Sequence, residues 1–282
     1  MTSPRTLLQA WDVPARKNLG QHFLADSAVA EAIVAAAAIT AADVVLEIGA
    51  GLGALTIPAA RVAKHVCAVE KDPRLVELLK TELALYRLAN VTVLEADILS
   101  VDLQQLADRF GAPRIVLGNL PYNISSQILV RLIQQRHGVR LAMLMFQKEL
   151  AQRLRASPGG RDYGRLSVML QYCAAVRTRL VVEAKRFFPR PKVDSEVLEI
   201  RFLPLPPAGV PDEGWFFQVI KAAFGQRRKT LKNALTGSDL GVSARQTGNA
   251  LAAAGIDPKR RAETLSVEEF AALSNALYRE RR

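Results

Sequence analysis

The stretch Val44-Val45-Leu46-Glu47-Ile48-Gly49-Ala50-Gly51-Leu52-Gly53-Ala54 decides the fold of this chain. Its first five residues are mostly apolar and β-branched, which is typical of a buried strand. The glycines that follow have no Cβ, so they permit a sharp turn and let a ligand lie against the backbone. With a helical pattern after them, the stretch predicts a nucleotide-binding strand–turn–helix unit.

The nucleotide is not settled by this loop, because its spacing also satisfies the dinucleotide fingerprint with Ala54 in the third place. Glu70, at the end of the second expected strand, would bind ribose hydroxyls of NAD or of S-adenosylmethionine alike. Asp97, after the third, favours S-adenosylmethionine because its carboxylate can accept from the adenine amino group. Its alternative role is a helix N-cap. Together these positions line the carboxyl edge of the expected sheet, where ligands bind.

Short apolar runs alternate with helical patterns, which indicates an α/β sheet wound with helices. The expected strands are Val44–Ile48, His65–Val69, Val91–Leu94, Ile115–Leu117, Leu141–Phe146, Leu180–Val182 and Val197–Phe202. Seven strands with a proline-rich connection before the last are typical of a class I S-adenosylmethionine-dependent methyltransferase, a Rossmann-like fold. Helical periodicity follows in Trp215–Leu235, Ala244–Ala254 and Val267–Arg279.

A linker is predicted at Pro204-Leu205-Pro206-Pro207. The expected domains are therefore a methyltransferase domain at residues 1–207 and a small all-α domain at residues 208–282.

Asn119-Leu120-Pro121-Tyr122, after the expected strand Ile115–Leu117, indicates chemistry on an aromatic amine. The Asn119 side-chain oxygen and a backbone carbonyl just after it can each accept one N–H of an exocyclic amine. Holding both hydrogens draws the nitrogen lone pair out of conjugation. Pro121 stiffens the turn, and Tyr122 offers a face on which a base can stack. The tetrapeptide predicts methylation of an adenine amino group, although an ordinary turn after a strand would look similar.

Composition narrows the class of partner and the setting. The 282 residues carry a net charge of +11, which favours a polyanionic partner. Cys67 and Cys173 lie far apart in apolar contexts, so buried free thiols are expected, and the histidines show no metal-ligand spacing. No signal-peptide pattern or membrane span is apparent, so a cytoplasmic location is expected. Nothing suggests an obligate dimer, and a monomer is expected.

The chain resembles the small-subunit ribosomal RNA adenine N6-dimethyltransferases over nearly its whole length. Besides the glycine loop, the segments that carry the resemblance are Leu19–Leu24, Asn119–Asn123, Tyr163–Val168, Phe187–Ser195 and Phe224–Leu231. The resemblance implies dimethylation, with S-adenosylmethionine, of two adjacent adenosines near the 3′ end of 16S rRNA in the small ribosomal subunit, as a step of ribosome biogenesis.

The resemblance also implies roles for particular residues. The cofactor contacts would be His22, Leu24, Gly49, Gly51, Glu70, Asp97 and Asn119. The family more usually has asparagine at the position of His22. Phe187, beside a proline-stiffened loop, would stack on the target base opposite Tyr122, although a core phenylalanine is its alternative. Phosphate contacts would come from a basic helical segment with Arg227, Arg228, Lys229 and Lys232, with further cations at Lys259-Arg260-Arg261 and at Arg16 and Lys17.

Three other functions stay open at this point. A large-subunit adenine methyltransferase of the antibiotic-resistance type shares the glycine loop, the Asn119 motif and the Phe187 loop, but the segment Arg227–Leu231 argues against it. A DNA adenine methyltransferase usually has a second proline where Leu120 stands. The protein could also act mainly as an assembly factor of the small subunit, with catalysis secondary.

Overall fold

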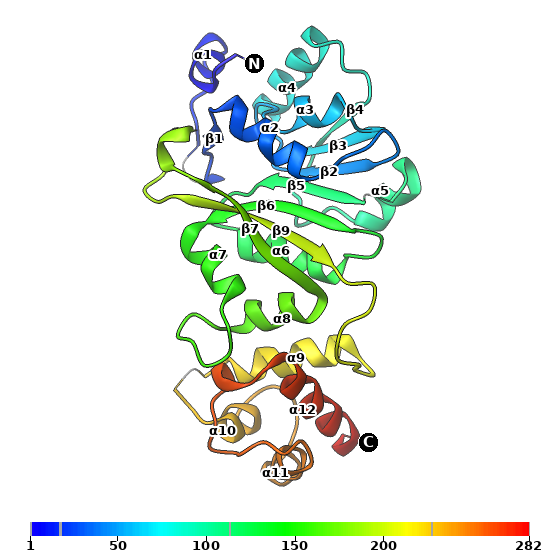
Figure 1. Cartoon of the computed structure of the whole chain (residues 1–282), viewed down its shortest axis with the longest axis vertical. Helices are drawn as coiled ribbons and strands as arrows, with labels where there is room; N and C mark the ends of the chain where they lie inside the picture. Colours follow the sequence, from blue (N-terminus) through cyan, green and yellow to red (C-terminus); the bar gives the residue numbers. More distant parts are fainter. Residues whose placement is uncertain (1, 17–18, 113, 227, 282) are drawn as a thin grey trace. The chain divides into compact units, whose positions relative to one another are not determined.

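The computed structural model describes residues 2–16, 19–112, 114–226 and 228–281. In these ranges the strands are β1 Phe23–Leu24, β2 Val44–Ile48, β3 His65–Glu70, β4 Val91–Glu95, β5 Ile115–Asn119, β6 Leu141–Gln147, β7 Ala174–Val182, β8 Phe187–Phe188 and β9 Ser195–Phe202. The helices, with η marking 3-10 turns, are α1 Pro4–Ala10, α2 Ser27–Ala36, α3 Thr56–Ala60, α4 Pro73–Leu85, α5 Leu103–Phe110, α6 Ser125–Gln134, α7 Lys148–Arg155, α8 Arg165–Cys173, η2 Ala184–Arg186, α9 Glu213–Ala223, α10 Leu231–Thr236, α11 Ala244–Ala253, η3 Ala262–Thr264 and α12 Val267–Glu280 (Figure 1).

A mixed sheet forms the centre of the first compact unit, which comprises Met1–Ala151 and Ala175–Phe202. In the described part of the chain its strand order is β4-β3-β2-β5-β6-β9-β7. The strands from β4 to β6 run parallel, whereas β9 is antiparallel to β6. The chain goes from β2 outward to β3 and β4, then returns to β5 on the other side of β2. Strand order therefore reverses between β2 and β5, and ligands of open α/β sheets bind at the carboxyl ends of strands at such a point.

Helices cover both faces of this sheet, which explains why β2 is apolar at consecutive positions. On one face, Val45 belongs to an apolar cluster with Ile33 of α2. On the other face, Leu46 lies beside Leu132 of α6. Figure 1 shows α2 in front of the sheet and α6 behind it. All residues of β2 are buried, so the strand is a firm support for the glycine loop that follows it.

The second compact unit comprises Gln152–Ala174 and Leu203–Arg282. Aromatic side chains form its centre and join α8 to the C-terminal helices. The ring of Tyr172, in α8, lies 4.4 Å from that of Phe216 in α9. Phe216 and Phe270, in α12, are both fully buried, at 0% exposure. These contacts give the unit an apolar core of its own.

The α/β fold predicted from the sequence is confirmed, with two local differences. β7 begins at Ala174 instead of Leu180, because Arg177 and Arg179 alternate along the strand and pair with Glu199 of β9. The predicted helix Trp215–Leu235 is divided into two, because α9 ends at Ala223 and α10 begins at Leu231, with a turn at the described residues 228–229 between them. Lys229 donates to the carbonyl of Gln226 in that turn, and α10 starts anew after an extended Thr230.

The compact units do not coincide with the predicted domains. Gln152–Ala174 groups with the C-terminal helices, and the division near the proline-rich linker follows Phe202. The expected functional boundary between residues 207 and 208 stays a prediction.

Candidate functional site

A cavity of about 210 Å3 opens in the first unit at the carboxyl edge of the sheet, where strand order reverses. The glycine loop, the ends of β3 to β5 and the segment just before β1 contribute to its lining. Sequence-predicted residues that line it are His22, Gly49, Gly51, Glu70, Asp97, Asn119, Leu120, Pro121 and Tyr122. The fold thus brings most of the expected site together from separate motifs.

The glycine loop is held in a conformation that its glycines permit. Gly49 and Gly51 have φ values of 72° and 55°, in the left-handed region that disfavours other residues. A Cβ at Gly51 would lie 3.3 Å from the ring of Phe23. The N–H of Gly49 donates to the carbonyl of Val69 over 2.9 Å, which ties the loop to the end of β3.

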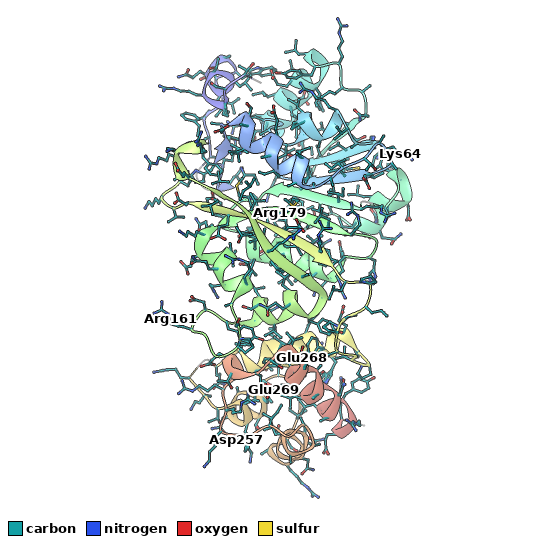
Figure 2. All side chains as sticks on the ribbon, in the orientation of Figure 1. Lys64, Arg161, Arg179, Asp257, Glu268 and Glu269 are labelled. Atoms are coloured by element: carbon teal, nitrogen blue, oxygen red, sulfur yellow. The ribbon has the colours of Figure 1, made fainter. Side chains whose placement is uncertain are left out.

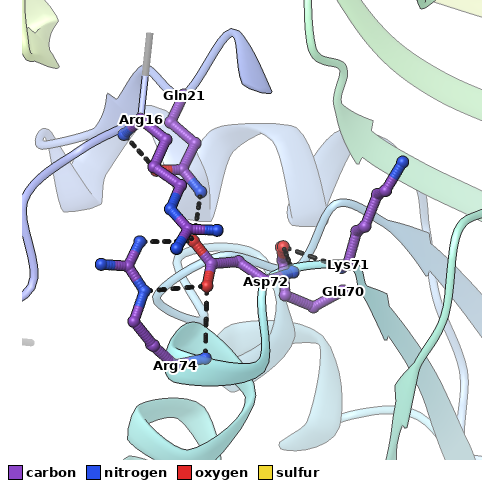
Figure 3. A network of polar contacts seen from close by, with 6 residues as sticks. All are labelled: Arg16, Gln21, Glu70, Lys71, Asp72 and Arg74. Atoms are coloured by element: carbon purple, nitrogen blue, oxygen red, sulfur yellow. Dashed lines mark hydrogen bonds and ion pairs between the residues drawn. The ribbon is translucent and has the colours of Figure 1, made fainter. Parts of the chain in front are cut away.

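Glu70, the last residue of β3, supports the same loop with its carboxylate. Oε2 accepts the N–H of Gly51 over 2.9 Å. Oε1 accepts those of Lys71 and Asp72 over 2.8 and 2.9 Å (Figure 3). Burial raises the pKa of this carboxyl, and the backbone donors oppose that rise. Since a carboxylate has about four acceptor sites, one on Oε2 remains for a ligand hydroxyl.

Asp97, which follows β4, lines the same cavity and is kept ionised by its neighbours. Lys71 Nζ lies 2.7 Å from Asp97 Oδ2, and the N–H of Leu99 donates to Oδ1. The hydrogen bond from Lys71 lowers the pKa of Asp97. The helix N-cap alternative is wrong, because α5 begins at Leu103 and its N-cap is Asp102.

The side chain of Asn119, at the end of β5, has a fixed orientation. Its Nδ2 donates to the backbone carbonyl of His22 over 2.8 Å. The amide nitrogen is therefore directed away from any substrate amine, and the side-chain oxygen is left as the acceptor. Leu120 is 1% exposed, so within the tetrapeptide it can meet a ligand only through its backbone.

His22 and Tyr122 form one wall of the cavity with their rings. The ring centroids are 5.5 Å apart at an angle of 24°. Nδ1 of His22 lies 2.7 Å from the carbonyl oxygen of Pro189. Because a carbonyl can only accept, Nδ1 carries the proton and Nε2 of a neutral ring is an acceptor. The Tyr122 hydroxyl bonds to that of Ser195 over 2.7 Å, which anchors its ring from the far end.

Leu24 lines a second hollow of about 130 Å3 and does not line the first. The two hollows share Phe23, Gly49, Gly51 and Asn119, so they are adjacent sections of one cleft around the glycine loop. The residues of this cleft include all the cofactor contacts that the sequence predicted.

Comparisons with known proteins give this cleft its context. The family description "Ribosomal RNA adenine dimethylase" matches residues 13–279. The chain belongs to the ribosomal RNA adenine dimethylase family. "Ribosomal RNA small subunit methyltransferase A" of Desulforapulum autotrophicum is 52% identical over 278 residues, which cover 99% of this chain and 97% of that protein. The protein of the same name from Anaeromyxobacter sp. strain K is 46% identical, with 98% of each chain covered.

Solved structures agree with that family. A dimethyladenosine transferase from Plasmodium falciparum has a TM-score of 0.72 and 26% identity, with 88% of this chain and 94% of that chain covered. The 23S rRNA methyltransferase ErmE has a TM-score of 0.65 and 25% identity, with 91% and 99% covered. The expected fold class and methyltransferase activity are thus confirmed for this adenine dimethylase. None of the helices in its described ranges combines the length and apolar character of a membrane span.

Phe187 of this adenine dimethylase is not at the cavity, contrary to its expected place opposite Tyr122. It is 4% exposed, pairs with Leu24 in the small sheet of β1 and β8, and belongs to the apolar cluster beneath α2. The core alternative therefore describes its position in this structure. The ring that faces Tyr122 belongs to His22.

Several functional neighbours were not found from the sequence. Gln21 Nε2 donates to Asp72 Oδ2 over 3.1 Å, and Gln21 Oε1 accepts the N–H of Arg16 over 2.7 Å (Figure 3). Arg74 makes two side-chain bonds to the same Asp72 carboxylate. This network fastens the segment before β1 to the start of α4. Gln21 stands inside the motif Leu19–Leu24, which was the available signal.

Glu47 was also missed as a titratable group. It is 2% exposed in β2, lines the second hollow and accepts from the Thr56 hydroxyl over 2.5 Å. Burial raises the pKa of Glu47 to about 8. An acidic residue inside an otherwise apolar strand was the signal for it.

The expected RNA-contacting residues lie in the second unit. Arg228 and Lys229 are exposed in the turn between α9 and α10, and Lys232 is half-buried in α10. The single basic helix expected there is therefore wrong. Arg227 and Lys17 lie outside the described residues. The N–H of Leu231 donates to the carbonyl of Arg260, so the turn lies beside the second basic cluster.

Cys67 and Cys173 are free and buried, as expected.

Proposed function

We propose that this chain uses S-adenosylmethionine to dimethylate the N6 amino groups of two adjacent adenosines near the 3′ end of 16S rRNA in the small ribosomal subunit. The observation that carries the proposal is the orientation of Asn119 in the lining of the cleft, where its two hollows meet. The names of the relatives that are 52% and 46% identical support the small subunit as the substrate particle and disfavour the large-subunit alternative.

The residues of the cleft fit S-adenosylmethionine, which would supply an electrophilic methyl group. The glycine loop leaves room where a Cβ would stand, and Glu70 keeps one acceptor site for a ribose hydroxyl. Asp97 is held ionised, so it can accept from an adenine amino group. Leu24, Gly49 and the carboxyl of Glu47 would surround the amino-acid portion in the second hollow.

The target adenine would enter between Asn119 and the ring of Tyr122. Oδ1 of Asn119 would accept one N–H of the amine, and the backbone carbonyl of Leu120 or Pro121 would accept the other. Tyr122 would support the base by stacking, a contact that tolerates an added methyl group. Because His22 and Ser195 fix Asn119 and Tyr122 before the substrate arrives, positioning would supply most of the rate.

Phosphate contacts are proposed for the exposed Arg228 and Lys229 and for Lys232, with Arg227 as an undescribed neighbour. Such contacts would orient the enzyme on the particle without reading sequence. The salt dependence of RNA binding is the slope of the logarithm of the binding constant against the logarithm of the salt concentration. Replacing Arg228 and Lys229 with glutamine should reduce the size of this slope by about one to two units. We propose that the protein acts as a monomer in the cytoplasm, where small subunits assemble.

The test is methyl transfer from labelled S-adenosylmethionine to undermethylated small subunits, followed by digestion and identification of the nucleosides. Dimethyladenosine in the small-subunit RNA is the expected product. Label confined to large-subunit RNA or to DNA would contradict the proposal, as would tight binding to the particle without any label.

A further inference from the structure

Three arginines surround one buried carboxylate on the outer strands of the sheet. Glu199 of β9 is 0% exposed, and its oxygens lie 2.7 Å from Arg177 Nη2, 2.5 Å from Arg179 Nε and 2.5 Å from Arg201 Nε. Each arginine side chain remains partly exposed, at 58%, 34% and 44%. Figure 2 labels Arg179 on β7, near the middle of the view. One negative charge among three positive ones leaves a net excess of two at this place.

The surrounding segment exposes more positive than negative side chains. Residues 174–202, all of them described, contain seven exposed cationic side chains, at Arg177, Arg179, Lys185, Arg186, Arg190, Lys192 and Arg201. Of the acidic residues there, Glu183 is exposed, Asp194 is half-buried, and Glu196 and Glu199 are buried. Surfaces normally mix both signs of charge, so this segment, with seven exposed cations and one exposed carboxylate, offers an anion an excess of positive charge.

Two contacts join this segment to the cavity. The Pro189 carbonyl accepts from the His22 ring, and Arg190 and Lys192 stand in the loop that follows. Ser195, the first residue of β9, bonds to the hydroxyl of Tyr122. From Ser195 to Arg201 the strand extends about 20 Å at the usual rise per residue. Cations therefore begin beside the cavity and continue along the outer strands.

We propose that Arg177, Arg179, Arg190, Lys192 and Arg201, hereafter the β7–β9 basic surface, bind the phosphate backbone of the RNA that flanks the target adenosine. This inference rests on the proposed function. Guanidinium groups match phosphate with paired N–H donors, and the shared Glu199 carboxylate holds three of them in place. Lys185 and Arg186 are left out of the surface because they pair with Glu183 and Asp26.

The test variant replaces Arg177, Arg190 and Lys192 with glutamine, which leaves Arg179 and Arg201 to compensate Glu199. We expect affinity for undermethylated small subunits to fall about tenfold and the salt dependence to lose about two units of log–log slope. KM for the particle should rise while kcat at saturating particle changes less than twofold. Binding of S-adenosylhomocysteine, measured by calorimetry, should stay within twofold and shows that the cleft is folded.

Two control variants make the result specific to the surface. The first control replaces three exposed cations with glutamine, at Lys64, Lys80 and Arg87. These residues lie on the β3–β4 side, at the opposite end of the strand order, so the variant should leave the slope unchanged. The second control replaces Arg177 and Arg190 with lysine. This variant keeps both positive charges and should preserve most of the slope.

The proposal is overturned if the test variant keeps the slope and the affinity, or if the Lys64 control lowers both equally. Failure of the proposed function is distinguishable, because the wild-type protein would then give no dimethyladenosine in small-subunit RNA whatever the variants do to binding.

Discussion

The amide nitrogen of Asn119 donates to the backbone carbonyl of His22 over 2.8 Å, across 97 positions of sequence. This bond leaves the amide oxygen of Asn119 as the acceptor at the cavity. It also ties the end of β5 to the segment that closes the cavity before β1. The orientation of the group expected to align the amine is thus set by the fold, before substrate binds.

Replacement of Asn119 with alanine should reduce single-turnover methyl transfer by about a hundredfold or more, as loss of a positioned hydrogen-bonding group does. Affinity for the small subunit should stay within about threefold, because phosphate contacts elsewhere supply most of that binding. Asn90→Ala is the matched control, since the Asn90 amide bonds to the carbonyls of Ala60 and Ala63 away from the cavity. Full activity in Asn119→Ala would exclude the alignment mechanism.

Glu47 should make the folded state less stable as pH rises. Burial raises the pKa of Glu47 to about 8 from an ordinary value of 4.5. Between these values the folded protein retains a proton that the unfolded chain has lost. The free energy of unfolding therefore decreases with pH in this window, by at most about 1.4 kcal/mol per pH unit.

The measurement is urea unfolding of Glu47→Gln beside the wild-type protein at several pH values from 5 to 8. The variant removes the titrating group and keeps a partner for the Thr56 hydroxyl. The free energy of unfolding of Glu47→Gln, relative to that of the wild-type protein, should increase steadily as pH rises. A difference that does not change with pH would show that Glu47 titrates near its ordinary value in the folded protein.

The Ser195 hydroxyl should support catalysis through Tyr122. Ser195 is 0% exposed, and its alanine variant would leave the hydroxyl of the half-buried Tyr122 without that partner, a loss of about 0.5–1.5 kcal/mol in stability. We expect kcat to fall about tenfold because the ring that supports the base is released, with little change in KM for S-adenosylmethionine.

The control for this variant is Ser167→Ala, which removes an equally buried hydroxyl bonded to the Arg153 carbonyl in the second unit. In a double-mutant cycle, Ser195→Ala should add little to Tyr122→Phe. Additive losses in kcat would mean that Ser195 does not act through Tyr122.

The sequence predicted that the glycine loop, Glu70, Asp97 and the tetrapeptide lie at one edge of the sheet, because each is a local motif at the end of a strand and parallel strands bring such ends together. Their roles toward cofactor and substrate stay predictions. For Phe187 the resemblance favoured base stacking over the core alternative, and the pairing with Leu24 that accompanies its burial joins residues 163 positions apart, which the sequence does not reveal. The Arg177–Glu199 and Gln21–Asp72 pairs were missed for the same reason, since polar partners on separate elements leave no spacing to detect. β7 was predicted too short, as Leu180–Val182, because Arg177 and Arg179 interrupt the apolar run by which a strand is recognised.

Gln21 should hold the segment before β1 over the cofactor. Its side chain joins the Arg16 N–H to the Asp72 carboxylate, whose pKa is lowered chiefly by the hydrogen bond from Arg74 (Figure 3). In Gln21→Met the side chain keeps its length but loses both bonds. We expect affinity for S-adenosylhomocysteine to fall about tenfold, near 1.4 kcal/mol, because binding must then order this segment. Amide exchange at Leu19–Phe23 should become faster in the free protein.

Gln104→Met is the control, because Gln104 makes the same kind of bond to Asp108 on the surface of α5. That variant should bind the cofactor analogue as the wild-type protein does. If Gln21→Met retains wild-type affinity while its exchange accelerates, the network stabilises the segment without contributing to the cofactor site. Unchanged exchange together with weaker binding would instead indicate a direct contact between Gln21 and the cofactor, in keeping with its place in the cavity lining.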